Sequence, residues 1–291
     1  MESYAYSAPA SVAETVALLA GHADAGRAVQ ILAGGTDVLV QMKGPAHTPR
    51  TLLDIKKLDE ANRLEVTPED IYIGAAVSSA RMNENAELKS ALPGLMEASD
   101  LIGSTQIQGR ATICGNLCNA SPAGDSIPAM IAAGAVCDLA SATGRRELAV
   151  EDFVVGVGKN ALESGEFLLG LRLPMPSTQT KDAYLRFTPR TEMDIAVAGV
   201  GISLTLQDLV CTHARVAIGA VAPTARLVPE AAAALVGSTL DDDALEAAAQ
   251  ACRDAASPIS DKRGTVEFRR KIVGVLCKRA AAQAAARVQG N

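Results

Sequence analysis

Apolar spacing near the start of the chain predicts an amphipathic helix. In "SVAETVALLA" (11–20) the apolar residues recur every three or four positions, which is the period of one face of a helix. Ser11 is a suitable N-cap, and Glu14, three positions later, completes a capping box. Glycine favours helix ends, so we expect Gly21 to terminate this helix.

The next segment, "AVQILAGGTDVLVQMK" (28–43), changes its pattern twice. A β-branched apolar run is followed by Gly34 and Gly35, and then by Thr36 and Asp37, two residue types that cap helix starts. The segment therefore predicts a strand, a tight turn and a helix.

Apolar runs separated by turn residues continue this alternation as far as residue 158. The pattern predicts one helix over 85–103 and another over 125–135, the latter capped by Asp125 or Ser126 and ended by Gly134. Short apolar or alternating runs predict strands at 51–55, 71–78, 135–141, 143–148 and 151–158.

The second half of the chain has longer strands and alanine-rich helices. Its prolines and Ser/Thr cluster make "LRLPMPSTQT" (171–180) the best candidate for a linker. Two long runs, 194–206 and 213–228, predict antiparallel strands, and helical spacing follows from 229 to 288. We therefore expect a second domain, so that the whole chain belongs to the α+β class.

Composition and charge exclude several classes of protein. The chain has 291 residues, of which 48% are hydrophobic and 21% charged, as is usual for a globular protein with real cores. Its net charge of −6 gives no general attraction for nucleic acid. Glu2 stands where a signal peptide would carry a cation, and no apolar run reaches the roughly 20 residues that span a bilayer. We expect a cytoplasmic protein without membrane insertion.

Two glycine-containing segments, 33–37 and 112–116, follow apolar runs and lead into small polar residues. Glycine permits positive φ and lets a ligand approach the backbone, so consecutive amides can converge on a phosphate. Apart from the flanking Arg110 neither segment has a cation, so amide dipoles would meet the charge. The alternative is that these glycines only form turns. Neither segment matches a Rossmann fingerprint or a P-loop.

The cysteines and histidines do not form a recognisable metal or nucleophile motif. Cys114 and Cys118 stand four residues apart, but no second short-spaced pair accompanies them, so buried free thiols are the simpler interpretation. His22, His47 and His213 are far apart, and no G-x-S-x-G motif accompanies them. We expect neither a metal site nor a catalytic acid or base in this chain.

Four motifs together resemble one known family. "ILAGGTDVLVQMK", "IGSTQIQGRATICGNLCNASPAGDS", "RTEMDIAVAGVGISL" and "EFRRKIVGVLCKRA" occur in the order and spacing of the FAD-binding medium subunit of molybdenum hydroxylases, the xanthine dehydrogenase and carbon monoxide dehydrogenase flavoproteins. The resemblance spans nearly the whole chain. It implies a two-lobed FAD-binding domain of the PCMH type over 1–176, with lobes of about 1–57 and 58–176, followed by a smaller α+β domain over 177–291.

The resemblance also implies which residues bind FAD. The first motif would place Leu32, Ala33, Gly34, Gly35, Thr36 and Asp37 at the pyrophosphate and its neighbours. The second would place Thr112, Gly115, Asn116 and Asn119 at the phosphate and ribityl region, with Asp125 accepting a ribityl hydroxyl. Further along the chain it implies flavin neighbours at Leu171 or Leu173, Arg186, Asp194 and Ile195.

One position departs from the family pattern. Relatives carry two glycines before the asparagine, whereas this chain has Cys114 in the first of these places. If the position required positive φ, a cysteine there would disturb the approach of its amide to phosphate.

The activity implied by the resemblance is electron transfer within a complex. The flavin would take electrons from a small subunit with two [2Fe–2S] clusters and pass them to an external acceptor, while a molybdopterin-binding large subunit would select the substrate. The implied assembly is a dimer of heterotrimers. Two alternatives remain, namely a self-sufficient flavin oxidase of related fold, in which a His or Cys often tethers the flavin, and a scaffold subunit without cofactor.

Overall fold

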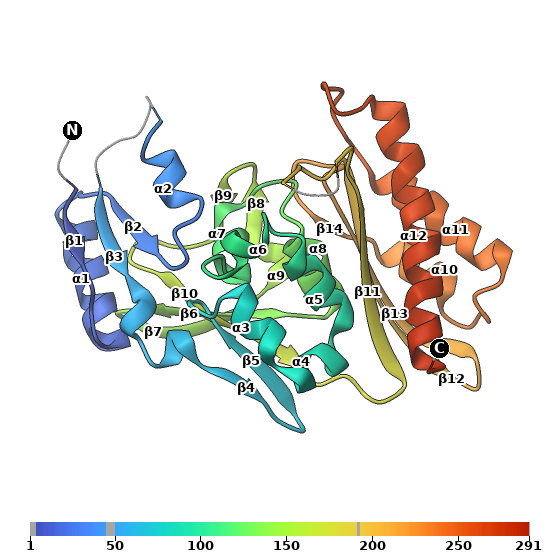
Figure 1. Ribbon diagram of the computed structural model, residues 1–291, viewed down its shortest axis with the longest axis horizontal. Coiled ribbons are helices and arrows are strands. Elements are labelled where there is room, and N and C mark those ends of the chain that lie inside the picture. Colours follow the sequence, from blue (N-terminus) through green and yellow to red (C-terminus); the bar gives the residue numbers. More distant parts are fainter. Residues whose placement is uncertain (1–3, 45–49, 191–192, 291) are drawn as a thin grey trace.

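A computed structural model describes residues 4–44, 50–190 and 193–290. The three larger β-sheets of the described residues follow one another along the long axis of the molecule, each with its own helices (Figure 1). Glu2, whose charge counted against a signal sequence, lies outside the described residues, as does His47. Among the described residues, no helix is both long and apolar enough to cross a membrane.

The N-terminal lobe is a small parallel sheet with one long helix. Strands β1 (Tyr6–Ser7), β3 (Thr51–Asp54) and β2 (Val29–Leu32) pair in that order, and α1 (Val12–Asp24) packs beside them. The Ser11 hydroxyl caps α1 by accepting from the amide of Glu14 at 3.1 Å, which confirms the predicted start. The predicted end was wrong, because α1 continues through Gly21 and the chain turns only at Gly26, whose φ is +62°.

The second lobe is built on a five-stranded antiparallel sheet. Its strands run in the order β4 (Leu64–Val66), β5 (Asp70–Gly74), β10 (Phe167–Pro174), β6 (Val136–Ser141) and β7 (Gly144–Ala149). A separate hairpin pairs β8 (Val154–Gly156) with β9 (Lys159–Asn160). The short 3₁₀ helices η1 (Ile55–Lys57) and η2 (Glu60–Asn62) connect this lobe to the first.

Short helices cover one face of this sheet. They are α3 (Ser79–Glu84), α4 (Ala86–Ala91), α5 (Pro93–Asp100), α6 (Thr105–Gln108), α7 (Ile113–Asn119), α8 (Ser126–Ala132) and α9 (Val150–Phe153). The single helix predicted over 85–103 was wrong, because Pro93 cannot continue α4 and instead takes the first position of α5. The strand predicted over 151–158 begins only at Val154, after α9.

The C-terminal domain packs three helices on a four-stranded antiparallel sheet. Strands β11 (Thr180–Phe187), β12 (Ala198–Gln207), β13 (Val210–Gly219) and β14 (Arg226–Leu227) pair in sequence order. Helices α10 (Pro229–Leu235), α11 (Asp242–Ala255) and α12 (Val266–Val288) lie on the outer side of this sheet (Figure 1). The predicted linker is shorter than expected, since β10 extends to Pro174 and β11 begins at Thr180.

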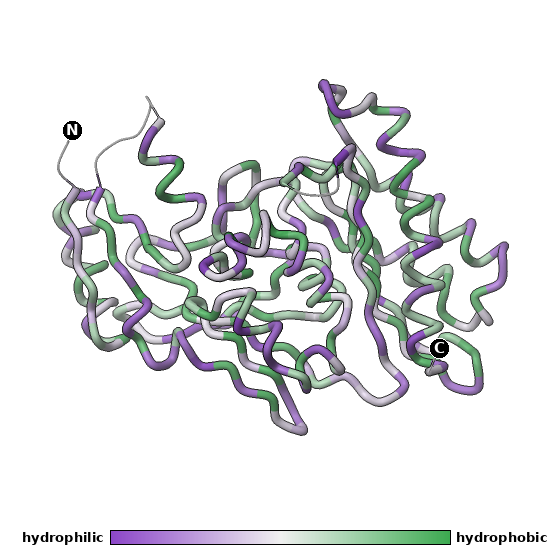
Figure 2. Tube along the Cα trace, in the orientation of Figure 1, coloured by the Kyte–Doolittle hydropathy of each residue, from purple (hydrophilic) through white to green (hydrophobic). Residues whose placement is uncertain are grey.

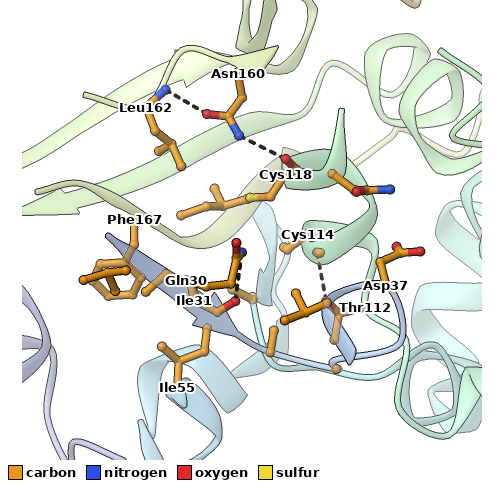
Figure 3. A pocket seen from close by; sticks show the side chains of 18 of the residues that line it. Gln30, Ile31, Asp37, Ile55, Thr112, Cys114, Cys118, Asn160, Leu162 and Phe167 are labelled. Carbon is orange, nitrogen blue, oxygen red and sulfur yellow. Dashed lines mark hydrogen bonds between the residues drawn. The ribbon is translucent and has the colours of Figure 1, made fainter. Parts of the chain in front are cut away.

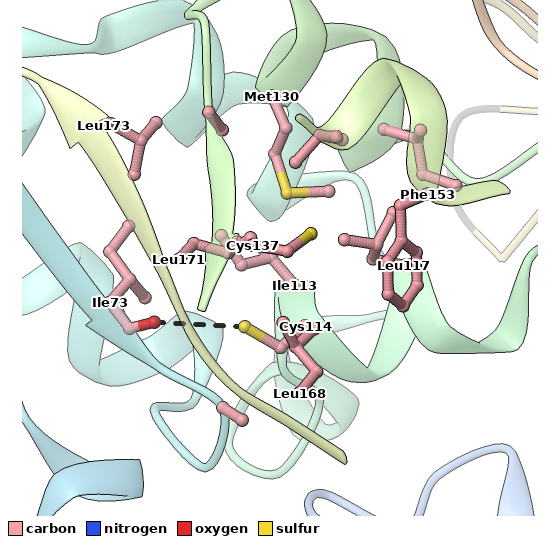
Figure 4. Packing of buried hydrophobic residues seen from close by; sticks show 14 of the residues in the cluster. Ile73, Ile113, Cys114, Leu117, Met130, Cys137, Phe153, Leu168, Leu171 and Leu173 are labelled. Carbon is pink, nitrogen blue, oxygen red and sulfur yellow. Dashed lines mark hydrogen bonds between the residues drawn. The ribbon is translucent and has the colours of Figure 1, made fainter. Parts of the chain in front are cut away.

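Two apolar cores correspond to the two larger sheets. One lies between the five-stranded sheet and its short helices and includes Cys114 and Phe153 (Figure 4). The other lies between β12, β13 and helices α10–α12. The hydropathy of the trace follows this division, with green segments inside and a purple loop before α12 (Figure 2).

Glycines let the second lobe and the C-terminal domain approach each other closely. Helix α8 packs against β12 and β13, where a Cβ at Gly201 would lie 2.5 Å from the carbonyl oxygen of Pro128 and one at Gly219 would lie 2.5 Å from its ring. Larger residues at these two positions would force the helix away from the sheet. The expected α+β architecture, with a two-lobed N-terminal part and a smaller C-terminal part, is confirmed.

Candidate functional site

A large cavity lies between the two N-terminal lobes. It has a volume of about 670 Å³ and is lined by the ends of α1 and β2, by the segments 33–38 and 111–119, and by the connection 158–168 (Figure 3). This volume falls within the range of small-molecule and cofactor sites, roughly 300–1,000 Å³. Both glycine-containing segments singled out in the sequence therefore meet at one cavity.

The first segment turns between β2 and helix α2 (Val38–Gln41) on two glycines with different tasks. Gly35 has φ +81°, a left-handed conformation that glycine adopts without strain. Gly34 packs directly onto the second segment, where a Cβ would overlap the carbonyl oxygen of Arg110 and lie 3.1 Å from Cα of Ala111. The turn thus brings two backbones together as only glycine allows.

The second segment forms a helix rather than a loop. Thr112 is the N-cap of α7, and its hydroxyl accepts from the amide of Gly115 at 2.9 Å. The left-handed residue comes only at the end of α7, at Ala120 with φ 50°. The alternative that the glycines only form turns does not describe this segment, because Gly115 lies in the first turn of a helix.

Cys114 fits this helical backbone without strain. It lies within α7, so positive φ is not required, and its thiol packs in the core where it donates to the carbonyl of Ile73 at 3.9 Å (Figure 4). Burial raises the pKa of the Cys114 thiol well above its ordinary value and that of Cys118 to about 12. Both thiols are therefore protonated and poor nucleophiles at neutral pH.

Side chains tie the two segments to each other and to the lobe behind them. At the rim, the side-chain amide of Gln41 donates to Oδ1 of Asn119 at 2.9 Å, joining α2 to α7. Behind the turn, Nζ of Lys56 donates to the carbonyl of Ala33 at 3.1 Å and pairs with Asp54 at 2.8 Å. These contacts fix the turn from both sides.

The cavity wall includes the carboxylate residue Asp37, which forms no ion pair with another described residue. Asp37 is the N-cap of α2, but its side chain makes no capping hydrogen bond, in contrast to the sequence prediction. Partial burial raises the pKa of Asp37 above its ordinary value. Its exposed carboxylate can accept hydrogen bonds from a ligand that donates them.

Most residues implied by the resemblance meet at the cavity, and the others do not. Among the lining residues are Ala33, Gly34, Gly35, Thr36, Asp37, Thr112, Gly115, Asn116 and Asn119. Leu32 is absent from the wall and instead packs beneath Gly35, its methyl 3.0 Å from where a Cβ would stand. Leu171 and Leu173 are fully buried in β10 within the sheet core.

Asp125, Arg186 and Asp194 do not line the cavity but form a hydrogen-bonded network with one another. Nη1 of Arg186 donates to Asp125 at 2.6 Å and to the carbonyls of Leu101 at 3.2 Å and Asp194 at 3.5 Å. The hydroxyl of Tyr184 also donates to Asp125, at 2.8 Å. Burial raises the pKa of Asp125 above its ordinary value, against the opposing effect of Arg186 and Tyr184. Ile195 is exposed at the surface beside Asp194.

The cavity also has polar residues that the sequence motifs did not indicate. At the end away from α2, Arg50 donates to Oε1 of Gln30 at 2.8 Å, and Arg27 lines the wall nearby. On the opposite side, Asn160 donates to the carbonyl of Cys118 at 3.0 Å (Figure 3). In the sequence, the glycines on either side of Val157 could have drawn attention to the segment that carries Asn160, because such glycines mark a turn.

No metal site emerges within the described ranges 4–44, 50–190 and 193–290. No group of three or more His, Cys, Asp or Glu residues there is arranged to hold an ion. All six cysteines are free thiols.

Comparison with known proteins assigns this geometry to a family. Residues 2–176 match the family described as the FAD binding domain in molybdopterin dehydrogenase, and residues 183–284 match the CO dehydrogenase flavoprotein C-terminal domain. The chain belongs to the FAD-binding subunits of the molybdenum hydroxylases. Like the other members of this family, it is an FAD-carrying electron-transfer subunit of an oxidoreductase.

Individual relatives of this FAD-binding subunit extend over almost its full length. The carbon monoxide dehydrogenase medium chain of Afipia carboxidovorans is 33% identical, with 99% of this chain and 98% of the relative covered. The nicotinate dehydrogenase FAD-subunit of Eubacterium barkeri is 30% identical over 94% of this chain and 93% of that one. A structure of reconstituted CO dehydrogenase from Oligotropha carboxidovorans superimposes with a TM-score of 0.92 at 33% identity, covering 98% of this chain and 99% of that chain.

Proposed function

We propose that the cavity between the two N-terminal lobes is where this subunit holds FAD, without a covalent bond. The observation that carries the proposal is the packing of Gly34 onto the backbone of Arg110, which brings both glycine-containing segments to one cavity. The residues fit the cofactor: the left-handed Gly35 allows close backbone approach, and uncharged polar groups at Thr36 and Asn116 suit a diphosphate. The thiols of α7, whose pKa is raised, are poor tethers.

Under this proposal the implied binding residues have different roles. Those that line the cavity, from Ala33 to Asp37 and from Thr112 to Asn119, contact the cofactor directly. Asp125, Arg186 and Asp194 act as positioning residues, because their hydrogen bonds fix the segments on either side of the wall. Leu32, Leu171 and Leu173 support the wall through packing, and Ile195 is exposed at the surface beside Asp194. We place the domain boundary at residues 176 and 177.

The chemistry divides between cofactor and protein. FAD, when bound, supplies a carrier that accepts electrons one at a time and releases them in pairs. The protein's part is to hold and orient it: the turn at Gly35 and the cap at Thr112 fix two backbone segments, and the Gln41–Asn119 contact links them at the rim. Asp37, whose carboxylate lies at the cavity wall, accepts hydrogen bonds from donors of the bound molecule. No side chain has to transfer a proton for this task.

Within the complex, the proposed partners are a small subunit with [2Fe–2S] clusters and a molybdopterin-binding large subunit, assembled as a dimer of heterotrimers. The CO dehydrogenase relatives, described as medium chains of multi-subunit enzymes, support this arrangement. The large subunit would then determine the substrate. The six free thiols agree with a reducing compartment, and we propose the cytoplasm.

The experiment compares the isolated subunit with the assembled complex. Each is mixed anaerobically with purines, N-heterocycles, aldehydes or carbon monoxide, and the loss of flavin absorbance is followed. We expect bleaching only in the complex. Rapid bleaching of the isolated subunit would contradict the proposal and favour the self-sufficient oxidase, whereas a colourless isolated subunit would favour a scaffold without cofactor.

A further inference from the structure

Residues 161–166, between β9 and β10, form a loop that reaches across the cavity. Leu162, Glu163 and Ser164 line the wall on the side of the second lobe. Gly165 has φ +82°, and a Cβ built on it would lie 4.0 Å from Cα of Ala20 in α1. The loop therefore extends from the second lobe to the helix of the first, and we call it the closing loop.

One arginine binds both ends of the closing loop. Nε and Nη2 of Arg146, on β7, donate to the two carboxylate oxygens of Glu166 at 2.7 and 2.8 Å. Nη2 also donates to the carbonyl of Ala161 at 3.0 Å. A planar guanidinium that holds a carboxylate through two parallel bonds fixes its direction as well as its distance. The position of the loop thus depends on this one side chain.

The carboxylate of Glu166 also organises the inside of the closing loop. It accepts from the amide of Glu163 at 2.8 Å, while the amide of Glu166 donates to the carbonyl of Glu163 at 3.1 Å. Its side chain is only 6% exposed, and hydrogen bonds from Arg146 lower the pKa of Glu166. Without the arginine, a nearly buried charge would lack its partner, so the loop would have to rearrange.

The part of the cavity beside the closing loop is mainly apolar. Ile55, Leu162 and Phe167 lie there, on the side away from Asp37 (Figure 3). The side-chain amide of Gln30 supplies hydrogen-bonding groups at the same wall. We call this part of the cavity the apolar recess. An aromatic ring with a few hydrogen-bonding atoms at its edge, such as adenine, matches a recess of this composition.

The place of the diphosphate assigns the apolar recess to adenosine rather than to flavin. Under the proposed function the diphosphate lies where Gly34 meets the backbone of Arg110. The family resemblance implies flavin neighbours at Asp125 and Arg186, whose hydrogen bond belongs to the side facing the C-terminal domain. FAD carries its two ring systems on either side of the diphosphate. The adenosine half therefore extends the other way, toward the closing loop.

We propose that Arg146 and Glu166 are positioning residues that set the closing loop against the adenosine half of FAD. The inference rests on the proposed function. The pair acts through the loop, because fixing its two ends keeps Leu162 and Phe167 in place at the apolar recess. A loop that is ordered before binding does not have to be ordered by the ligand, and this raises the affinity.

The test measures binding of FAD and of ADP to the full-length subunit from which FAD has been removed. ADP carries adenosine and the diphosphate without the flavin. Arg146→Gln removes the guanidinium, whereas Arg146→Lys keeps the charge but cannot make the two parallel bonds. Arg145→Gln is the matched control, because Arg145 precedes Arg146 on β7, points to the opposite face and pairs with Asp138 at 3.4 Å.

We expect Arg146→Gln to raise the dissociation constants of FAD and ADP by the same factor, about tenfold or more. Arg146→Lys should raise both by a smaller factor, and Arg145→Gln should leave both unchanged. At saturating FAD, the visible absorption and circular dichroism of the flavin should be the same in all four chains, because the pair acts at the other end of the cofactor. Denaturant titration of the FAD-free chains checks their folding, and if Arg146→Gln does not fold, Arg146→Lys provides the comparison.

The outcomes separate this inference from the proposed function. Unchanged FAD affinity in the folded Arg146 variants would overturn the positioning role, and so would a loss of affinity for FAD without a loss for ADP. An altered flavin spectrum at saturation would also overturn it, because the pair would then act on the whole cavity. If the unchanged chain bound FAD but not millimolar ADP, the adenosine assignment would fall while the FAD site stood. An unchanged chain that binds no FAD would instead refute the proposed function.

Discussion

At the scale of single residues, two adjacent glycines do different work at the cavity. Gly34 is needed because another backbone occupies the space of its side chain, whereas Gly35 is needed because its φ is +81°. The sequence indicates that glycines stand here, but not which backbone they face. The partner, Arg110, is 76 residues away from Gly34 along the chain, and no local pattern encodes that contact.

We expect Gly35→Ala to lower the affinity for FAD about tenfold or more, because alanine is strained at this φ and its Cβ would lie 3.0 Å from Leu32. Gly237→Ala is the matched control, since Gly237 has φ +85° with no atom within 4 Å of a Cβ. Flavin absorbance per chain after dialysis measures the effect. Similar flavin loss in both variants would assign it to general backbone strain rather than to the site.

Cys114 shows how a motif can mislead at this scale. The family pattern predicts glycine, and a left-handed backbone would make cysteine costly there. The structure places the residue within α7 with its thiol in the core. A glycine in a consensus thus indicates only that a small residue fits, and the local backbone decides whether a side chain is tolerated.

At the scale of elements, helices and strands with a clear apolar period were predicted well, but the residues at which they begin and end were predicted less well. The long strands β12 and β13 and the start of α1 followed directly from apolar spacing and capping residues. The prediction of a single helix over 85–103 was wrong because the apolar spacing continues through Pro93, whereas a helical backbone cannot continue through a proline. The end of α1 failed because packing outweighs the modest cost of an internal glycine.

That internal glycine offers a simple route to a more stable subunit. Gly21 is exposed in the interior of α1, and no atom lies within 4 Å of a Cβ built on it. Gly21→Ala should raise the free energy of unfolding by about 0.5–1 kcal/mol, because alanine loses less backbone freedom on folding. Denaturant titration checks this. As a counterpart, Gly26→Ala should destabilise, since Gly26 has φ +62°, and a gain there would contradict the explanation.

At the scale of the whole molecule, the order of domains was predictable and their contacts were not. The shift from short mixed elements to long strands and alanine-rich helices marks the C-terminal domain in the sequence. Nothing in the sequence predicts that the connection 158–168 closes the cavity, or that Arg186 joins Asp125 to the surface loops. Such contacts depend on how the two lobes and the C-terminal domain pack against one another, and the spacing of residues along the chain does not predict that packing.

A buried carboxylate at the junction of these units makes stability depend on pH. Asp182 of β11 accepts from the amides of Gly94 and Leu95 at 2.9 and 2.8 Å, but burial still raises its pKa to about 6. An unfolded aspartate has a pKa of about 3.9. Between these values the folded chain binds more protons than the unfolded chain, so the contribution of Asp182 to stability falls as pH rises.

Asp182→Asn removes this dependence because asparagine is neutral throughout. The free energy of unfolding of the variant minus that of the unchanged chain should rise by about 1–3 kcal/mol from about pH 4 to about pH 7. A pH-independent loss is added to this difference, because the NH2 group of asparagine cannot accept from the amide of Gly94 or Leu95. Paired denaturant titrations at several pH values provide the measurement. A difference between the two chains that stays constant over this range would show that Asp182 is ionised in both states.

Because of the contact between Gly34 and Arg110, the concentration of FAD also affects how well the folded chain resists opening and proteolysis. FAD held between the two segments binds only chains in which these segments are in contact. Binding therefore shifts the equilibrium from partly opened conformations toward the closed one. At a free FAD concentration about 100 times the dissociation constant, this linkage adds about 2.7 kcal/mol. When flavin is scarce, the lobes separate more often, and proteases reach the exposed connections. Cellular flavin supply would thereby set how much of this subunit accumulates, before any partner is available.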